Sequence, residues 1–228
     1  MLRAVLFDLG GTLVKTADIP EILKRILSTY GIHRSLEEIS QAHKEADREI
    51  RLEDYELPWD EFWSKWNLRI LKRLGVRGNI KHLARDITER WWGNADVELY
   101  PDVIETLGAL KGMGLKLGLV TNGFKLDLDE VLRRVNLEGA FDVTVGVDSV
   151  GRPKPCREIF IYAIGRLGVS ARESLFVGDS IEHDYMGALK VGMDALLIDR
   201  EGKVKRSDVK KISSLLEVVG YIKNLSKA

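Results

Sequence analysis

Four short segments of the sequence carry side chains that could perform catalysis or bind a metal ion. Asp8 precedes two glycines and a threonine, and Thr121-Asn122 offers a hydroxyl and an amide. Lys154 stands between two prolines, and Asp179 and Asp184 are five positions apart. A carboxylate beside glycine amides is a candidate nucleophile or metal ligand. Together the segments provide oxygen ligands for a hard cation such as Mg²⁺, and a lysine for an anion.

The elements that must position these residues are read from alternating apolar runs and helical patterns. Short apolar runs typical of buried parallel strands occur at Ala4–Leu9, Leu115–Val120, Phe141–Val147, Ser174–Val177 and Ala195–Ile198. Helical patterns lie at Val103–Met113, Asp127–Val135, Cys156–Leu167 and His183–Val191. This alternation predicts an α/β, Rossmann-like parallel sheet with helices on both faces. Ligands bind beyond the carboxyl ends of such strands, where the polar segments fall.

Residues 16–95 interrupt the alternation with helical periodicity and no convincing strand. Helices are expected at Ile19–Tyr30, Leu36–Arg51, Asp60–Leu74 and Ile80–Trp92, with a capping box that starts at Ser35. All five tryptophans lie between positions 59 and 92, and a stripe of three on one helix favours a packed core over a substrate wall. We therefore expect an all-helical cap domain over residues 16–95 and a core domain over 1–15 and 96–228. The tail, Ser207–Lys223, is expected to form a last amphipathic helix.

Composition narrows the classes of partner. The 228 residues carry 35 Lys and Arg against 35 Asp and Glu, so a chain-wide basic footprint for nucleic acid is not expected.

The single cysteine, Cys156, fits a reducing compartment. No apolar stretch approaches the length of a membrane span, and no signal peptide is recognised, so a cytoplasmic protein is expected. Many charges and one glutamine are a weak thermophile signature. No oligomeric state is predicted.

The four segments together resemble the motifs of the haloacid dehalogenase-like (HAD) hydrolase superfamily. Asp8-Leu9-Gly10-Gly11-Thr12 matches the family's Asp-x-Asp-Gly-Thr except at the third position. Thr121 matches the second motif, Lys154-Pro155 the third, and Gly178 to Asp184 the fourth, Gly-Asp-Ser-x-x-x-Asp. One motif alone would be a weak signal, whereas four in order across the chain are a strong one. A helical cap inserted after the first motif is also a family arrangement.

The resemblance implies a Mg²⁺-dependent phosphatase acting on a small phosphorylated metabolite. In that scheme Asp8 attacks phosphorus and forms an aspartyl-phosphate, and Thr121 and Lys154 serve as the other catalytic residues. The implied metal ligands are Asp8, the Gly10 backbone carbonyl and Asp179, with Asp184 in support. The implied phosphate ligands are Thr121, Asn122 through its backbone amide, Lys154 and Gly11.

The departure at Gly10 keeps other interpretations open. Family phosphatases carry an aspartate there, which protonates the leaving oxygen, an assistance worth about 10²–10⁴-fold. A good leaving group could make that acid dispensable, or His183 or a cap side chain could replace it. Three alternative functions are a 2-haloacid dehalogenase, a phosphonate-cleaving enzyme using Lys15 or Lys24, and a weakly active protein that binds a phosphate ligand.

Overall fold

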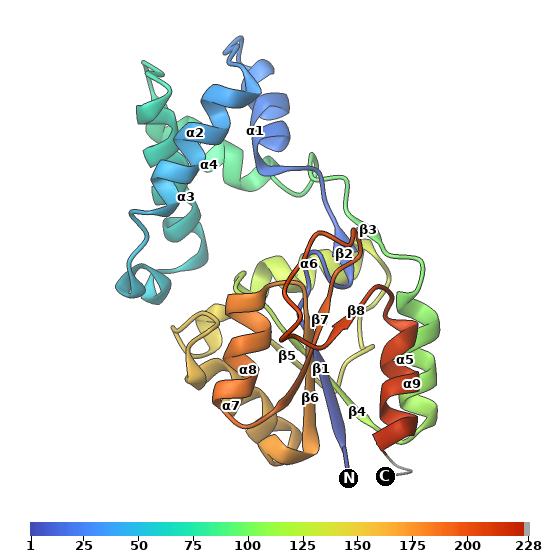
Figure 1. Ribbon diagram of the computed structural model, residues 1–228. Coiled ribbons are helices and arrows are strands. Elements are labelled where there is room, and N and C mark those ends of the chain that lie inside the picture. The colour runs from blue at the N-terminus through green and yellow to red at the C-terminus, as the bar shows by residue number, and fades with distance from the viewer. Residues whose placement is uncertain (226–228) are drawn as a thin grey trace. The chain divides into compact units, whose positions relative to one another are not determined.

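The computed structural model describes residues 1–225, which divide into two compact units, residues 1–15 with 98–225 and residues 16–97 (Figure 1). The first unit is built on a six-stranded parallel sheet in the order β5-β4-β1-β6-β7-β8. Its strands are β1 (Ala4–Phe7), β4 (Lys116–Val120), β5 (Val143–Val145), β6 (Ser174–Gly178), β7 (Asp194–Ile198) and β8 (Lys211–Ile212). The central strand β1 is flanked by β4 and β6, so the three polar segments that follow these strands converge at one edge.

Helices cover both faces of this sheet (Figure 1). Helices α7 (Arg157–Leu167) and α8 (Met186–Lys190) lie on one face, where Phe160 packs edge-on against Phe176 of β6. On the opposite face α5 (Val103–Gly112) and α9 (Leu216–Leu225) pack side by side. Helix α6 (Lys125–Arg134) packs beside β5. The predicted Rossmann-like α/β fold is confirmed: the sheet is parallel, and helices cover both of its faces.

Residues 16–97 form a helical unit of their own. It contains α1 (Ile19–Ser28), α2 (Leu36–Asp47), α3 (Trp59–Arg73) and α4 (Ile80–Arg90). Ser35 and Glu38 form the expected capping box at the start of α2. Trp66 is buried, and the rings of Trp63 and Trp91 meet it edge-on. Trp66 and, in part, Trp63 therefore pack in the core of this unit, as their helical spacing favoured, whereas Trp59 of the same stripe is half-buried.

Two short strands, β2 (Val14–Lys15) and β3 (Glu98–Leu99), pair antiparallel where the chain leaves the first unit and returns to it. The sequence did not reveal either, because a two-residue strand shows no alternation. The expected tail helix over 207–223 is wrong in its first half. Residues 211–212 form β8 at the sheet edge, and α9 starts only at Leu216. Burial of Val209 and Ile212 beside β7 explains the apolar spacing that resembled a helix.

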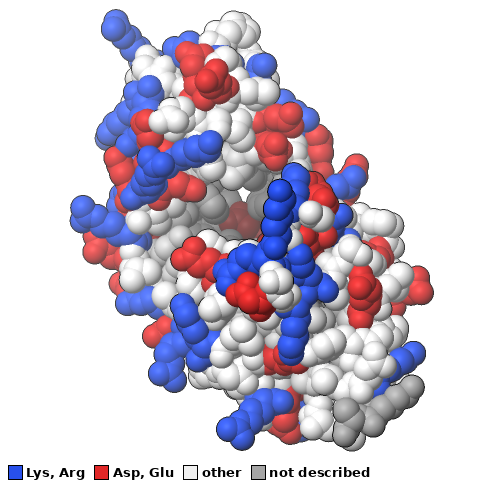
Figure 2. All heavy atoms as spheres, in the orientation of Figure 1, with Lys and Arg blue, Asp and Glu red and all other residues white. Residues whose placement is uncertain are grey.

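Both signs of charge are spread over the face shown in Figure 2, in keeping with the zero net charge. Within residues 1–225, none of the helices combines the length and apolar character that crossing a membrane requires.

Candidate active site

Asp8 is the first residue after β1, and its carboxylate is held by two donors. Lys154 Nζ donates to Asp8 Oδ1 at 2.6 Å, and Thr12 Oγ1 donates to Asp8 Oδ2 at 3.2 Å. Its backbone N–H donates to the Val177 carbonyl, which ties it to β6. The residue is 8% exposed. The carboxylate is thus fixed in orientation, as a nucleophile must be.

Lys154 lies in the loop between β5 and α7 and reaches into the interior. Its ammonium group contacts Asp8, the Val120 carbonyl at 3.0 Å and Asp184 Oδ1 at 2.7 Å. Burial disfavours the charged form of Lys154, but Asp8 and Asp184 outweigh that effect and raise its pKa. The ammonium group therefore stays charged between two carboxylates.

Asn122 holds the backbone of this lysine. Its side-chain Oδ1 accepts from the Lys154 N–H at 2.6 Å, and its Nδ2 donates to the Lys154 carbonyl at 3.1 Å. The sequence suggested only the backbone amide of Asn122 as a phosphate donor. The structure assigns its side chain to fixing the loop that carries Lys154.

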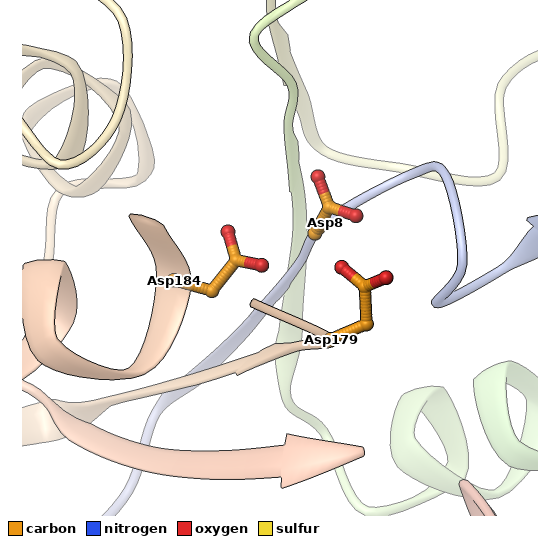
Figure 3. Close-up of side chains that lie close together, drawn as sticks. All are labelled: Asp8, Asp179 and Asp184. Atoms are coloured by element: carbon orange, nitrogen blue, oxygen red, sulfur yellow. The ribbon is translucent and has the colours of Figure 1, made fainter. Parts of the chain in front are cut away.

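The carboxylates of Asp8, Asp179 and Asp184 point toward a common space (Figure 3), with one oxygen of each within 4.8 Å of the others. Asp179 directly follows β6 and is exposed, whereas Asp184 is buried in the turn Ile181–Tyr185 and accepts from the Ser180 N–H at 3.0 Å. Burial raises the pKa of Asp8 to about 7, with Asp184 and Asp179 adding to the effect and Lys154 opposing it. Desolvation and the charge of Asp184 likewise raise the pKa of Asp179.

The donor set suits a divalent cation. Three carboxylates face one ammonium group, which leaves two negative charges uncompensated when all are ionised. Mg²⁺ prefers oxygen ligands and is usually bound by one or two carboxylates together with water and substrate phosphate, which this set can provide. Burial is the main cause of the raised pKa of Asp8, and the neighbouring charges of Asp184 and Asp179 add to it.

The two glycines after Asp8 are not equivalent. Gly11 has a φ of +71°, and a Cβ there would lie 2.1 Å from Asp179 Oδ2, so only glycine fits. A Cβ on Gly10 would meet nothing within 4 Å. The missing acid at position 10 is therefore not a consequence of crowding.

Thr121 follows β4, the strand next to β1, and is buried. Its Oγ1 accepts a hydrogen bond from the Gly123 N–H at 3.1 Å, which leaves its hydroxyl proton for another acceptor. His183 is exposed, and its ring lies within hydrogen-bond distance of the Ser180 hydroxyl, next to Asp179 in the chain. Lys15 forms an exposed ion pair with Glu98 at 2.7 Å, which weakens it as a Schiff-base lysine. Thr12 belongs to the first motif but had no predicted role, and the structure gives it the hydrogen bond to Asp8 Oδ2.

A protein-family model for haloacid dehalogenase-like hydrolases matches residues 2–192. The chain belongs to this family. It is 30% identical to the glyceraldehyde 3-phosphate phosphatase of Methanocaldococcus jannaschii, over the full length of both proteins. It is 33% identical to the enzyme of that name from Methanopyrus kandleri, over 89% of this chain and 86% of the relative. These matches place the chain among the phosphatases of the HAD family.

Solved structures agree on the fold. A HAD phosphatase from Thermococcus onnurineus has a TM-score of 0.67 at 29% identity, covering 97% of this chain and 98% of that one. The putative HAD-hydrolase YfnB from Bacillus subtilis, bound to magnesium, has a TM-score of 0.75 at 21% identity, with 97% and 98% covered. The latter likeness concerns the fold alone.

Proposed function

We propose that this HAD-family enzyme hydrolyses a small phosphorylated metabolite with the help of Mg²⁺, through an aspartyl-phosphate on Asp8. The observation that carries the proposal is the position of Lys154 Nζ, 2.6 Å from Asp8 and 2.7 Å from Asp184. One cation thus lies beside the candidate nucleophile and the acidic cluster. Charge neutralisation next to an oriented nucleophile is what phosphoryl transfer needs most.

The metal would be held by Asp8, Asp179 and the Gly10 carbonyl, with Asp184 in support. When bound, Mg²⁺ supplies positive charge to the phosphoryl oxygens and lowers the pKa of Asp8, so that its carboxylate is ionised at neutral pH. Gly11 would let the backbone approach the phosphoryl group closely, since no side chain intervenes.

The remaining steps use the protein's own groups. An Asp8 oxygen would attack phosphorus as the bond to the leaving oxygen breaks, and the Thr121 hydroxyl and Lys154 would bind phosphoryl oxygens. Water would then attack the aspartyl-phosphate, release inorganic phosphate and restore the Asp8 carboxylate. The absence of a carboxyl at Gly10 means that the leaving oxygen takes its proton from another group or departs without one.

Three-carbon sugar phosphates are the first substrates to test, because relatives matched over all or most of their length are named glyceraldehyde 3-phosphate phosphatases. The decisive experiment measures phosphate release from glyceraldehyde 3-phosphate, acetyl phosphate, p-nitrophenyl phosphate and a metabolite panel, each with Mg²⁺ or EDTA. We expect Mg²⁺-dependent turnover that Asp8→Asn abolishes. Turnover that survives Asp8→Asn, or no phosphate release in the whole panel, would rule the proposal out. Halide release from 2-haloacids, assayed in parallel, would instead support the dehalogenase alternative.

A further inference from the structure

Arg200 links three segments of the first unit that are far apart in the sequence. It lies two residues after β7, and its side chain is 16% exposed. One terminal nitrogen donates to Asp102 Oδ2 at 3.0 Å, and the other donates to Asp102 Oδ1 at 3.1 Å and to the Thr12 carbonyl at 2.8 Å. Its guanidinium carbon also lies 3.7 Å from the centre of the Tyr100 ring.

The loop that carries Arg200 is itself fixed. The neighbouring Asp199 accepts hydrogen bonds from the backbone N–H groups of Lys203 and Val204, both at 2.9 Å. The Asp199 N–H in turn donates to the carbonyl of Ile212 in β8. The backbone of Arg200 is therefore fixed, so its guanidinium group can hold its hydrogen-bond partners in place.

Asp102, the carboxylate that accepts from Arg200, is also held by other donors. Besides Arg200 it accepts from the Ser214 hydroxyl and the Leu215 N–H, both at 2.8 Å, at the start of α9. Burial opposes ionisation of Asp102, but these donors, Arg200 foremost, lower its pKa. The pair is a bidentate, charge-assisted contact with little exposure, which is the strong form of such contacts.

The contact with Thr12 is the one that leads to the active site. Thr12 is fully buried, its carbonyl accepts from Arg200, and its hydroxyl donates to Asp8 Oδ2. Lys154 orients the other Asp8 oxygen. The adjoining segment is held as well, because Leu13 accepts a backbone hydrogen bond from Tyr100, whose ring stacks on Arg200.

We propose that Arg200 is a positioning residue, which holds Thr12 in place and through it the orientation of the Asp8 carboxylate. The family match ends at residue 192, so the assignment rests on the contacts of this chain. The kinetic part of the proposal rests on the proposed phosphatase function, and the structural part does not.

The test compares Arg200→Met, Arg200→Lys and Tyr221→Phe. Tyr221 is the matched control, because its hydroxyl donates to Asp194 at 2.5 Å and accepts from Lys210 at 2.9 Å, and neither partner belongs to the Asp8 and Thr12 contacts. With Mg²⁺ and p-nitrophenyl phosphate, we expect Arg200→Met to lower kcat about 10- to 100-fold while KM stays within about twofold, since a misplaced nucleophile slows the chemical step. Arg200→Lys should restore part of kcat, and Tyr221→Phe should keep it within about twofold.

A double-mutant cycle and a crystal structure close the test. If Arg200 acts through Thr12, the losses in kcat for Arg200→Met and Thr12→Val should be less than additive. The Arg200→Met crystal structure should show Thr12 shifted and the Asp8 carboxylate rotated. Fully additive losses, or unchanged Asp8 and Thr12, would overturn the proposal. If the wild type releases no phosphate from any substrate, the proposed function fails, and the position of Asp8 in the variant still decides the role of Arg200.

Discussion

Lys154 Nζ lies 2.6 Å from Asp8 Oδ1, although the two residues are 146 positions apart in the sequence. The lysine side chain is 2% exposed and that of Asp8 11% exposed, so their attraction is little screened by water. The carboxylates of Asp179 and Asp184 lie close to this contact. The Asn122 side chain binds the backbone of Lys154, and the Thr12 hydroxyl binds the second oxygen of Asp8.

Removal of the Lys154 charge should damage both catalysis and stability. We expect Lys154→Met to lower kcat at least about 100-fold. Loss of one partner of a buried ion pair also costs about 3–5 kcal/mol, because Asp8 and Asp184 remain without their cation. Urea unfolding in EDTA measures the stability term, and Asp8→Asn in the Lys154→Met background should recover part of it. Lys125→Met, which removes an exposed ion pair with Asp129, should change stability by less than about 0.5 kcal/mol. Equal losses for the two lysine variants would contradict this account.

Asp8 makes stability depend on pH in the absence of metal. Its folded-state pKa of about 7 exceeds the ordinary value of 3.8, so between these values the folded protein binds more protons than the unfolded chain. The free energy of unfolding of the metal-free protein should therefore fall as the pH rises from about 4 to 7. Mg²⁺ should restore stability, and more at pH 8 than at pH 5. Urea titrations across this range, with EDTA or Mg²⁺, measure both effects. Asp8→Asn should flatten the metal-free profile, and an unchanged slope in that variant would exclude Asp8 as the cause.

Substitution of the adjacent glycines Gly10 and Gly11 by alanine should affect stability and activity very differently. Gly11→Ala forces a Cβ into Asp179 and a left-handed backbone, so we expect a loss of at least about 1–2 kcal/mol and of most phosphatase activity. Gly10→Ala meets open space and should change the unfolding free energy by less than about 1 kcal/mol. Thermal unfolding and kcat of the pair provide the measurement, with each variant the control for the other. A well-tolerated Gly11→Ala would show that the close approach to Asp179 is unimportant.

Gly10→Asp should raise activity on poor leaving groups. The position has room for a side chain, and a carboxyl there could protonate the leaving oxygen. We expect an increase of about 10-fold or more in kcat for an alkyl phosphate such as glyceraldehyde 3-phosphate, within the 10²–10⁴-fold ceiling of general acid catalysis. Acetyl phosphate, whose leaving group needs no proton, should gain little. Gly10→Asn controls for size, and an equal gain on both substrates would argue against leaving-group protonation.

In the helical unit, Asp54 should stabilise the fold down to unusually acid pH. Burial opposes its ionisation, but hydrogen bonds from Lys65, the Arg51 N–H and Arg69 outweigh it and lower its pKa to about 2. Asp54 should add about 1–2 kcal/mol to the free energy of unfolding. This contribution is present above the ordinary pKa of 3.8 and is lost as the pH falls toward 2. Asp54→Asn should therefore destabilise the protein at pH 6 but much less at pH 2. Chemical unfolding at the two pH values tests this, and an equal effect at both would refute it.

Much of the core could be predicted from the sequence because its signals are local. A buried parallel strand must be apolar along its whole length, so β1, β4, β5, β6 and β7 appear as short apolar runs. The residues that follow parallel strands share one edge, which brought Asp8, Thr121 and Asp179 forward as candidates. The start of helix α2 could be predicted from the capping box at Ser35, because this interaction joins residues only three positions apart.

Other features depend on contacts that no local pattern encodes. The strands β2, β3 and β8 have two residues each and exist only because a partner strand lies beside them. Nothing in the local sequence distinguishes Thr12 and Arg200 from other polar residues. In the folded protein Thr12 donates to Asp8, and Arg200 donates to Thr12 and Asp102.

The sequence by itself determined the fold class, the helical insertion and the candidate nucleophile, since each depends on residue types at short spacings. Only the tertiary structure decided which donors hold each Asp8 oxygen, that Asn122 grips the Lys154 backbone, and that position 10 has room for a side chain. The physical reason is that a pKa, a hydrogen bond and a free volume depend on all neighbours in space, and folding brings most of these neighbours from distant parts of the chain.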